Sequence, residues 1–314
     1  MSGVPEPLDA HYGYVADALR RGRVVPLLGA GVNLCDPGRR TWKLGENLPG
    51  GAELAQFIAE MCTYPGQDHA DLLRVAQYAQ ATRGEGPLYD HLHEVFDAAY
   101  RYTSVHRFLA SLPSSLEAAG GPRRHQLIVT TNYDDALEQA LTEAGEPFDL
   151  VWYSTRGQSA QRKFMHKPFE AEARTIERPN EYHLPVDDRT VILKIHGAVS
   201  RADFDADSYV ISEDDYIRFL MQSSLQELIP TSLLARLFNS HILFLGYSLH
   251  DWNLRVILHQ VATQRDLSRD SWAIQKEVQE IDKVLWSCRD VHLHEVPLDS
   301  YIAELNRRMF GREL

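Results

Sequence analysis

Cysteine is scarce in this chain, with three residues among 314, and no two of them form a Cys-x-x-Cys pair. Zinc ribbons and disulfide frameworks need more cysteines at closer spacing, so neither is expected. The three thiols are predicted to be buried and reduced; they are Cys35, Cys62 and Cys288.

Long apolar runs are also missing. No stretch approaches the roughly 18 apolar residues of a membrane span, and residues 1–7 contain no basic segment that leads into an apolar run. We therefore expect a soluble, cytoplasmic protein without membrane contacts. The sequence also lacks a Gly-x-x-x-x-Gly-Lys-[Ser/Thr] loop, so it is not expected to be an ATPase itself.

Basic residues are outnumbered by acidic ones, 32 to 44, which gives a formal net charge of −12. Extended binding to a phosphate backbone requires many lysines and arginines, so it is not expected to be the main task. The short basic clusters at 20–23, 39–40 and 123–124 are interpreted as solvated surface or helix ends. No metal site is predicted, because the closely spaced histidines at 292 and 294 have no evident third ligand.

Apolar, β-rich runs alternate with amphipathic segments along the chain, as in a parallel sheet flanked by helices. The runs at 127–129, 191–193 and 242–245 do not alternate with polar residues, which is typical of strands buried on both faces. The predicted strands are 24–28, 127–131, 191–195, 208–211, 241–246, 271–275 and 291–296.

Two long intervals interrupt the strand pattern. Between the first two predicted strands lie almost only helical patterns, which predict a helical lobe inserted beside the sheet. The segment 150–189 carries aromatic residues and several prolines, and it predicts an irregular loop or small cap.

The first predicted strand breaks into Gly-Ala-Gly-Val-Asn at 29–33. Glycine in such a strand-to-loop turn lets the backbone approach a pyrophosphate closely. Leu34 stands where a dinucleotide-binding fingerprint has its third glycine. On this motif alone, a nucleotide site and a purely structural turn both stay open.

Three further strands end in small and polar residues. Thr-Thr-Asn-Tyr-Asp occupies 130–134, His-Gly occupies 196–197, and Gly-Tyr-Ser-Leu occupies 246–249. Taken singly, an asparagine, aspartate or serine there can simply cap the next helix. Ligands of open parallel sheets bind outside the carboxyl ends of the strands, so these loops and 29–33 are predicted to meet at one crevice.

Together, and in this order, the four motifs resemble the NAD-binding and catalytic motifs of the sirtuin superfamily. More narrowly, they resemble the sirtuin-like domains of bacterial anti-phage defence systems. The resemblance implies a single sirtuin-like domain over 1–314, with an α/β fold: a Rossmann-like parallel sheet flanked by helices, and an inserted helical lobe. The expected parts are a core of about 8–35, 125–150 and 190–314, a helical lobe of about 36–122, and the loop or cap of about 150–189.

The sequence departs from the deacetylating sirtuins at two places. Those enzymes carry a four-cysteine zinc module after the catalytic histidine, where this chain has only Cys288. Asn33 replaces the usual serine, and residues 34–38 lack the Asp-Phe-Arg element. The resemblance thus implies an NAD glycohydrolase that depletes the NAD of an infected cell. The alternatives are an NAD-dependent protein deacylase and a non-catalytic subunit that senses NAD or ADP-ribose.

Catalytic roles follow from the resemblance for three residues. Asn132 would hydrogen-bond the ribose hydroxyls or the attacking water, and His196 would act as general base, as histidine can near neutral pH. Asp134 would orient Asn132 or the nicotinamide end, unless it caps the next helix. The residues expected to bind NAD are Gly29, Ala30, Gly31, Asn33, Thr131, Gly246 and Ser248.

The resemblance also implies partners. NAD is the expected substrate, and no metal is expected to take part. Relatives of this kind are often homo-oligomers and often act beside a separate ATPase, such as a HerA-type translocase, or beside a nucleic-acid-sensing protein.

Overall fold

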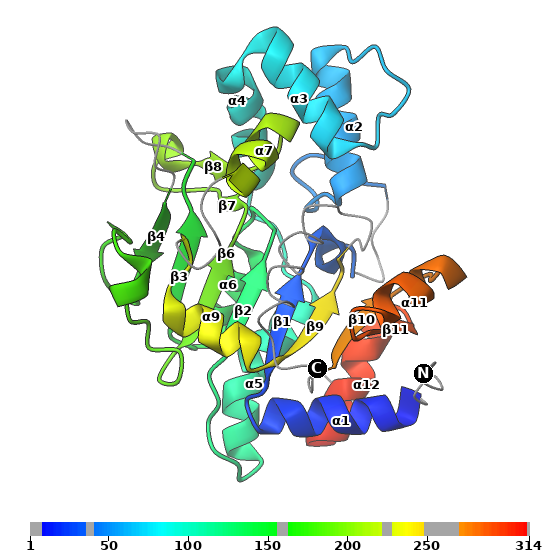
Figure 1. Cartoon of the computed structure of the whole chain (residues 1–314), viewed down its shortest axis with the longest axis vertical. Helices are drawn as coiled ribbons and strands as arrows, with labels where there is room; N and C mark the ends of the chain where they lie inside the picture. The colour runs from blue at the N-terminus through cyan, green and yellow to red at the C-terminus, as the bar shows by residue number, and fades with distance from the viewer. Residues whose placement is uncertain (1–7, 36–40, 156–162, 222–227, 248–269, 313–314) are drawn as a thin grey trace.

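A nine-stranded sheet forms the centre of the molecule (Figure 1). The structure, a computed structural model, describes residues 8–35, 41–155, 163–221, 228–247 and 270–312. In spatial order the strands are β11 (Val291–Glu295), β10 (Ser271–Gln275), β9 (His241–Leu245), β1 (Val24–Leu28), β2 (Leu127–Thr130), β6 (Thr190–Lys194), β3 (Phe148–Tyr153), β4 (Phe164–Lys167) and β5 (Arg174–Thr175). Neighbours from β11 to β3 are parallel, which confirms the predicted α/β fold.

Helices cover both faces of this sheet. One face carries α1 (Leu8–Arg20), α5 (Ser104–Ala118), α6 (Ala136–Glu143) and α12 (Leu298–Phe310), and the other carries α9 (Thr231–Phe238) and α11 (Glu280–Ser287). Successive strand side chains point to opposite faces, so Val25 and Leu27 enter one core while Val24 and Leu28 enter the other. This double burial explains why the central strands lack polar alternation.

The helical lobe lies beyond the carboxyl ends of the strands (Figure 1). It consists of α2 (Gly51–Cys62), α3 (Leu72–Arg83) and α4 (Glu85–Phe96), and α7 (Glu213–Met221) packs against α3. The lobe has its own apolar core, which includes Leu54, Leu92 and Phe96. Helix α5 differs from the prediction, because Phe108 and Leu112 pack it onto the sheet rather than into the lobe.

Two predicted segments need correction. The predicted strand 208–211 is not in the main sheet: β8 (Ser208–Tyr209) pairs only with β7 (Gly197–Ala198) in a separate two-stranded sheet. The segment 150–189, predicted as an irregular loop or cap, instead completes β3 and forms β4 and β5. Its strand character is hidden by buried polar residues such as His166, whose Nε2 lies 3.1 Å from Oδ2 of the buried Asp149 on β3.

Short 3₁₀ turns complete the described part of the chain; they are η1 (Ala30–Leu34), η2 (Pro179–Glu181) and η3 (Phe204–Ala206).

Of the three free thiols, Cys62 is buried, Cys35 is half-buried and Cys288 is exposed, so the expected burial is wrong for Cys288. None of the described helices has both the length and the apolar character that a membrane crossing requires.

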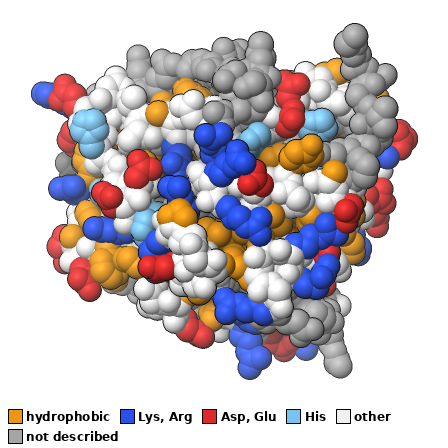
Figure 2. Space-filling model, turned by 90° about the horizontal axis from the view of Figure 1, so that it is seen from below, with side chains coloured by type: hydrophobic (Ala, Val, Ile, Leu, Met, Phe, Trp, Pro, Cys, Tyr) orange, Lys and Arg blue, Asp and Glu red, His pale blue; other side chains and the backbone are white. Residues whose placement is uncertain are grey.

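Figure 2 views the end of the molecule opposite the lobe, where arginine and lysine side chains are interspersed with acidic ones. Arg21, the residue after α1, pairs with Asp17 on that helix at 2.8 Å, and both side chains are largely exposed. Arg123 pairs with the exposed Glu117 at 3.0 Å. These two clusters are therefore surface features, as predicted, whereas the cluster at 39–40 lies outside the described residues.

Two buried histidines, one on α1 and one on β11, lie with their rings in contact and tilted by 32°. The ring centroids of His11 and His294 are 3.8 Å apart, and Nε2 of His11 lies 2.9 Å from the Tyr301 hydroxyl. Burial, reinforced by the nearby His294 and His292, lowers the pKa of His11 to about 3. Burial and His292 lower the pKa of His294 to about 4. Both side chains are therefore neutral at neutral pH.

We expect this pair to make the fold sensitive to acid. In the unfolded chain both imidazoles regain a pKa of about 6.5, so below that pH the unfolded state binds protons that the folded state does not. Each histidine should lower the free energy of unfolding by about 2 kcal/mol at pH 5 and contribute nothing above about pH 7. Urea unfolding at pH 5 and pH 7 measures the difference.

A single substitution isolates this effect. His294→Phe keeps an aromatic ring but cannot titrate, so it should remove about 2 kcal/mol of the pH dependence. The matched control is His183→Phe, because His183 is exposed and its loss should change nothing. A pH dependence that is the same in His294→Phe and wild type would contradict the prediction.

Candidate functional site

A cavity of about 630 Å³ lies at the carboxyl ends of the strands, beneath the lobe. Its size falls within the range of small-molecule sites, about 300–1,000 Å³. The loops after β1, β2, β6, β9 and β10 all contribute to its wall. These five strands are neighbours, and the chain leaves β1 toward β2 but returns through β9, so the cavity occupies the point at which strand order reverses.

All but one of the predicted site residues line this cavity: Gly29, Ala30, Gly31, Asn33, Thr131, Asn132, Asp134, His196 and Gly246. Ser248 lies outside the described residues. The roles of these residues stay predictions, since a shared cavity establishes proximity and not chemistry.

The glycines after β1 and β9 pack backbone against backbone. The N–H of Gly31 donates to the carbonyl of Gly246 at 2.8 Å. A Cβ on Gly31 would lie 2.5 Å from that same carbonyl oxygen. Gly246 also has a positive φ of 63°, which disfavours any other residue. The close approach of the two loops is thus a structural reason for glycine in the Gly-Ala-Gly motif. It applies whether or not a ligand binds there.

Gly246→Ala should destabilise the protein by about 1–3 kcal/mol, because the added Cβ overpacks this junction. The new atom would lie 2.2 Å from the backbone nitrogen of Val32, which cannot move without shifting the 29–33 loop. Gly13→Ala on α1 is the matched control, because its Cβ would meet nothing within 4 Å. Chemical unfolding of both variants measures the effect; equal stabilities would refute the packing argument.

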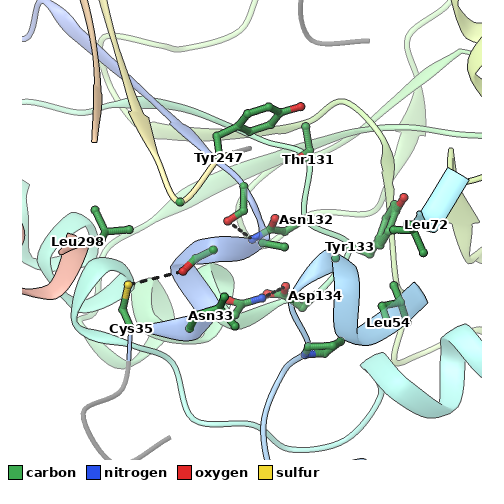
Figure 3. A pocket seen from close by; sticks show the side chains of 18 of the residues that line it. Asn33, Cys35, Leu54, Leu72, Thr131, Asn132, Tyr133, Asp134, Tyr247 and Leu298 are labelled. Carbon is green, nitrogen blue, oxygen red and sulfur yellow. Dashed lines mark hydrogen bonds between the residues drawn. The ribbon is translucent and has the colours of Figure 1, made fainter. Parts of the chain in front are cut away.

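Two asparagines and an aspartate line the centre of the cavity (Figure 3). The side-chain amide of Asn33 donates to Oδ2 of Asp134 at 2.9 Å, and Asp134 Oδ1 accepts from the N–H of Ala136 at 3.1 Å. The amide of Asn132 donates to the carbonyl of Gly29 at 3.3 Å. Asp134 therefore contacts Asn33 and the start of α6 through its side chain, rather than Asn132.

The oxygen atoms of both amides are candidates for contact with a ligand. Oδ1 of Asn33 and Oδ1 of Asn132 are buried, and neither has a hydrogen-bond partner within the described parts of the chain. A buried amide oxygen normally accepts a hydrogen bond. A hydroxyl or water in the cavity would supply the missing donor.

The start of α5 supports this wall from behind. Thr103 donates its hydroxyl to the carbonyl of Val32 at 2.9 Å and its backbone N–H to Nδ1 of His106 at 3.1 Å. Burial lowers the pKa of His106 to about 4, against the opposing charge of Asp134. A neutral His106 can therefore accept at Nδ1, which fixes the first turn of α5 against the 29–33 loop.

His196 lies two residues after the end of β6 and is buried at the cavity wall. Its Nδ1 lies 3.2 Å from the hydroxyl of Tyr216, whose ring packs edge-on against the imidazole at 5.0 Å. Tyr216 sits on α7, which begins with a capping box in which the N–H of Asp215 bonds Ser212 Oγ and the N–H of Ser212 bonds Asp215. The contact between Tyr216 and His196 fixes the orientation of the His196 ring.

Sequence reasoning missed a large part of the cavity wall. Tyr216 was not predicted as a site residue, and the strand-end rule would have found Gln275 at the end of β10 and Lys276 after it. Further lining residues come from the lobe and the segment before it, and none of them was predicted as a site residue; they are Pro49, Gly50, Gly51, Leu54, Leu72 and Phe96. The start of α12 adds Pro297, Leu298 and Asp299.

Among the residues that the structure describes, no three His, Cys, Asp or Glu side chains lie close enough together to hold a metal ion. A reaction without a metal therefore stays a prediction.

A second cavity, of about 580 Å³, lies at the other end of the strands near Arg21 and Trp272, away from the predicted motifs.

More than half of this chain is similar in sequence to known proteins. Residues 126–293, more than half of the chain, match the family model of the SIR2-like domain. Defense-associated sirtuin 2 of Bacillus subtilis is 23% identical over 264 residues, which cover 82% of this chain and 21% of that protein. NAD(+) hydrolase ThsA of Enterococcus faecium is 26% identical over 266 residues, which cover 84% of this chain and 45% of that protein.

A further relative, NAD(+) hydrolase ThsA of Acinetobacter baumannii (strain 532279), is 27% identical over 214 residues, which cover 68% of this chain and 36% of that protein. The alignments thus span less than half the length of each of these three relatives.

Proposed function

The chain belongs to the SIR2-like domain family, and from this premise we propose that it is an NAD glycohydrolase, which cleaves NAD to nicotinamide and ADP-ribose. The observation that carries the proposal is one cavity of about 630 Å³ lined by both Asn132 and His196 beside the Gly-Ala-Gly loop. Two of the relatives above are named NAD(+) hydrolases, which supports the same activity.

The reaction asks for two contributions from the protein. Nicotinamide leaves NAD as a neutral molecule when the bond from its ring nitrogen to ribose C1′ breaks, so no acid is needed to expel it. The ribose passes through an oxocarbenium-like state, as in other glycosyl cleavage, and a water oxygen bonds to C1′. The enzyme must therefore hold the ribose and accept a proton from the water.

Asn132 and His196 are proposed to make these contributions. The buried Oδ1 of Asn132 accepts a hydrogen bond from a ribose hydroxyl or from the attacking water. His196 takes the proton, directly from the water or through a ribose hydroxyl, with its ring held by Tyr216. Asp134 is proposed to act indirectly, by holding the amide of Asn33 at 2.9 Å. The 29–33 loop and Gly246 are proposed to hold the diphosphate, with Ser248 and Thr131 beside the bound NAD.

The biological setting is a proposal of the same kind. One relative is named a defence-associated sirtuin, which supports a role in anti-phage defence through depletion of NAD in the cytoplasm. We propose a homo-oligomer that works with a separate partner, either a HerA-type ATPase or a nucleic-acid-sensing protein. Mass measurement of the purified chain tests the oligomer, and co-purification tests the partner.

The activity is tested by incubating the purified chain with NAD and measuring nicotinamide and ADP-ribose, alone and after addition of bacterial lysate. Release of both products in equal amounts supports the proposal. An acetylated peptide should not change the products; formation of acetylated ADP-ribose would instead identify a deacylase. NAD binding without any turnover, in either condition, would identify a sensor and refute hydrolysis.

A further inference from the structure

Lys194, the last residue of β6, is a fully buried cation that none of the proposed steps uses. Its side chain is only 1% exposed, and lysine is almost never buried to this degree without partners. Its Nζ lies 2.6 Å from Oε1 of Glu138 and donates to the carbonyls of Asp134 at 2.5 Å and Tyr133 at 3.4 Å. An ammonium group has three protons, and here three acceptors surround it.

All three acceptors belong to one short segment, 133–138, which runs from the loop after β2 into the first turn of α6. This segment begins directly after Asn132. Lys194 pairs with Thr130 in the sheet, and the N–H of Ile195 donates to the Thr130 carbonyl at 3.0 Å. The Lys194 side chain therefore links two parts of the site. One is the loop that contains Asn132, and the other is β6, the strand that precedes His196.

Stability alone is a poor reason for this arrangement. Taking an ammonium and a carboxylate out of water costs about as much as their attraction returns, and apolar replacements of a buried pair are often neutral or stabilising. In some proteins a buried polar or ionic group instead serves to specify a single geometry. Two of the three contacts of Lys194 are with the backbone carbonyls of cavity-lining residues, Tyr133 and Asp134, where geometry matters most.

We propose that Lys194 is a positioning residue: with Glu138, it holds the 132–134 loop so that Asn132 and His196 keep the spacing that hydrolysis requires. This inference rests on the proposed NAD hydrolysis. It assigns to Lys194 no contact with the substrate, only control of the loop next to it.

The test removes the charge pair without leaving a buried charge behind. Lys194→Met alone leaves the Glu138 carboxylate buried without its positively charged partner, and it should therefore destabilise the fold. The double variant Lys194→Met/Glu138→Leu removes both charges, so its melting temperature should return close to that of wild type. Its kcat should stay about tenfold to a hundredfold below wild type, with a smaller change in KM, because the loop carbonyls have lost their donor.

The matched control is Lys283→Met/Glu280→Leu, which removes a pair with the same 2.6 Å separation on the exposed surface of α11. Its kcat should equal that of wild type. If the double variant at Lys194 and Glu138 recovers full kcat together with its melting temperature, the pair is only structural and the inference is overturned.

A second readout separates this inference from the proposed function. Amide hydrogen exchange in 131–136 should become about tenfold faster in the Lys194→Met/Glu138→Leu variant, whereas exchange in α1 should not change. If wild type does not hydrolyse NAD, the proposed function fails, yet the exchange result still decides whether Lys194 holds the loop. Unchanged exchange in 131–136 would overturn the inference whatever the activity of wild type.

Discussion

His196→Ala should lower the turnover of NAD by about a hundredfold or more, because it removes the proposed general base. The imidazole lies at the cavity wall and is oriented by the Tyr216 hydroxyl at 3.2 Å. Release of nicotinamide under saturating NAD measures the effect. Far-ultraviolet circular dichroism and thermal unfolding of the same samples establish whether the variant has kept its fold.

Two matched variants sharpen this result. Tyr216→Phe keeps both rings but removes the hydroxyl, so it should reduce turnover by about tenfold or less, as expected of a group that only orients the base. His183→Ala removes an exposed histidine and should leave turnover unchanged. Near-normal turnover in a folded His196→Ala protein would remove this residue from the mechanism.

Asn132→Ala should also cost about a hundredfold or more in turnover, because the proposed contact with the ribose or the water is lost. Asn132→Asp has nearly the same shape but cannot donate to the Gly29 carbonyl, which the amide reaches at 3.3 Å. If the amide donor matters, this variant should be impaired as well. Asn239→Ala is the control, because that exposed amide only caps its own helix by bonding Ala235.

Separate measurement of kcat and of the Kd for NAD shows which role Asn132 plays. A loss confined to kcat, with the Kd unchanged, fits a contact made mainly in the transition state. A loss confined to the Kd would mean that Asn132 only binds NAD. Full activity in Asn132→Ala would exclude it from both roles.

Local sequence signals predicted the central strands and the place of the cavity. The apolar runs at 127–129, 191–193 and 242–245 are the strands β2, β6 and β9, buried on both faces. In a parallel sheet the carboxyl ends of such strands share one edge, so polar residues that follow them must lie near one another. Glycine at 29, 31 and 246 was informative for a related reason, because no side chain fits where the two loops touch.

Other parts of the fold were not predictable from local pattern. Strands β4 and β5 are short, and β4 contains the buried His166, whose partner Asp149 is 17 residues away. Helix α5 has the same amphipathic pattern as the lobe helices, and only its packing against α12 and α6 places it on the sheet. Periodicity reports that a face is buried, but not what buries it.

The sequence by itself determined the class of fold, the strand ends that meet at one edge, and the family resemblance carried by Asn132, His196 and the Gly-Ala-Gly loop. Only the tertiary structure decided that Tyr216 orients His196, that Asp134 holds Asn33 rather than Asn132, and that Lys194 is buried against Glu138. The class of fold and the meeting of the strand ends follow from backbone geometry, which repeats along the chain and leaves a local sequence pattern. The contacts of Tyr216, Asp134 and Lys194 join side chains from separate elements, and they exist only once helices and strands have packed together.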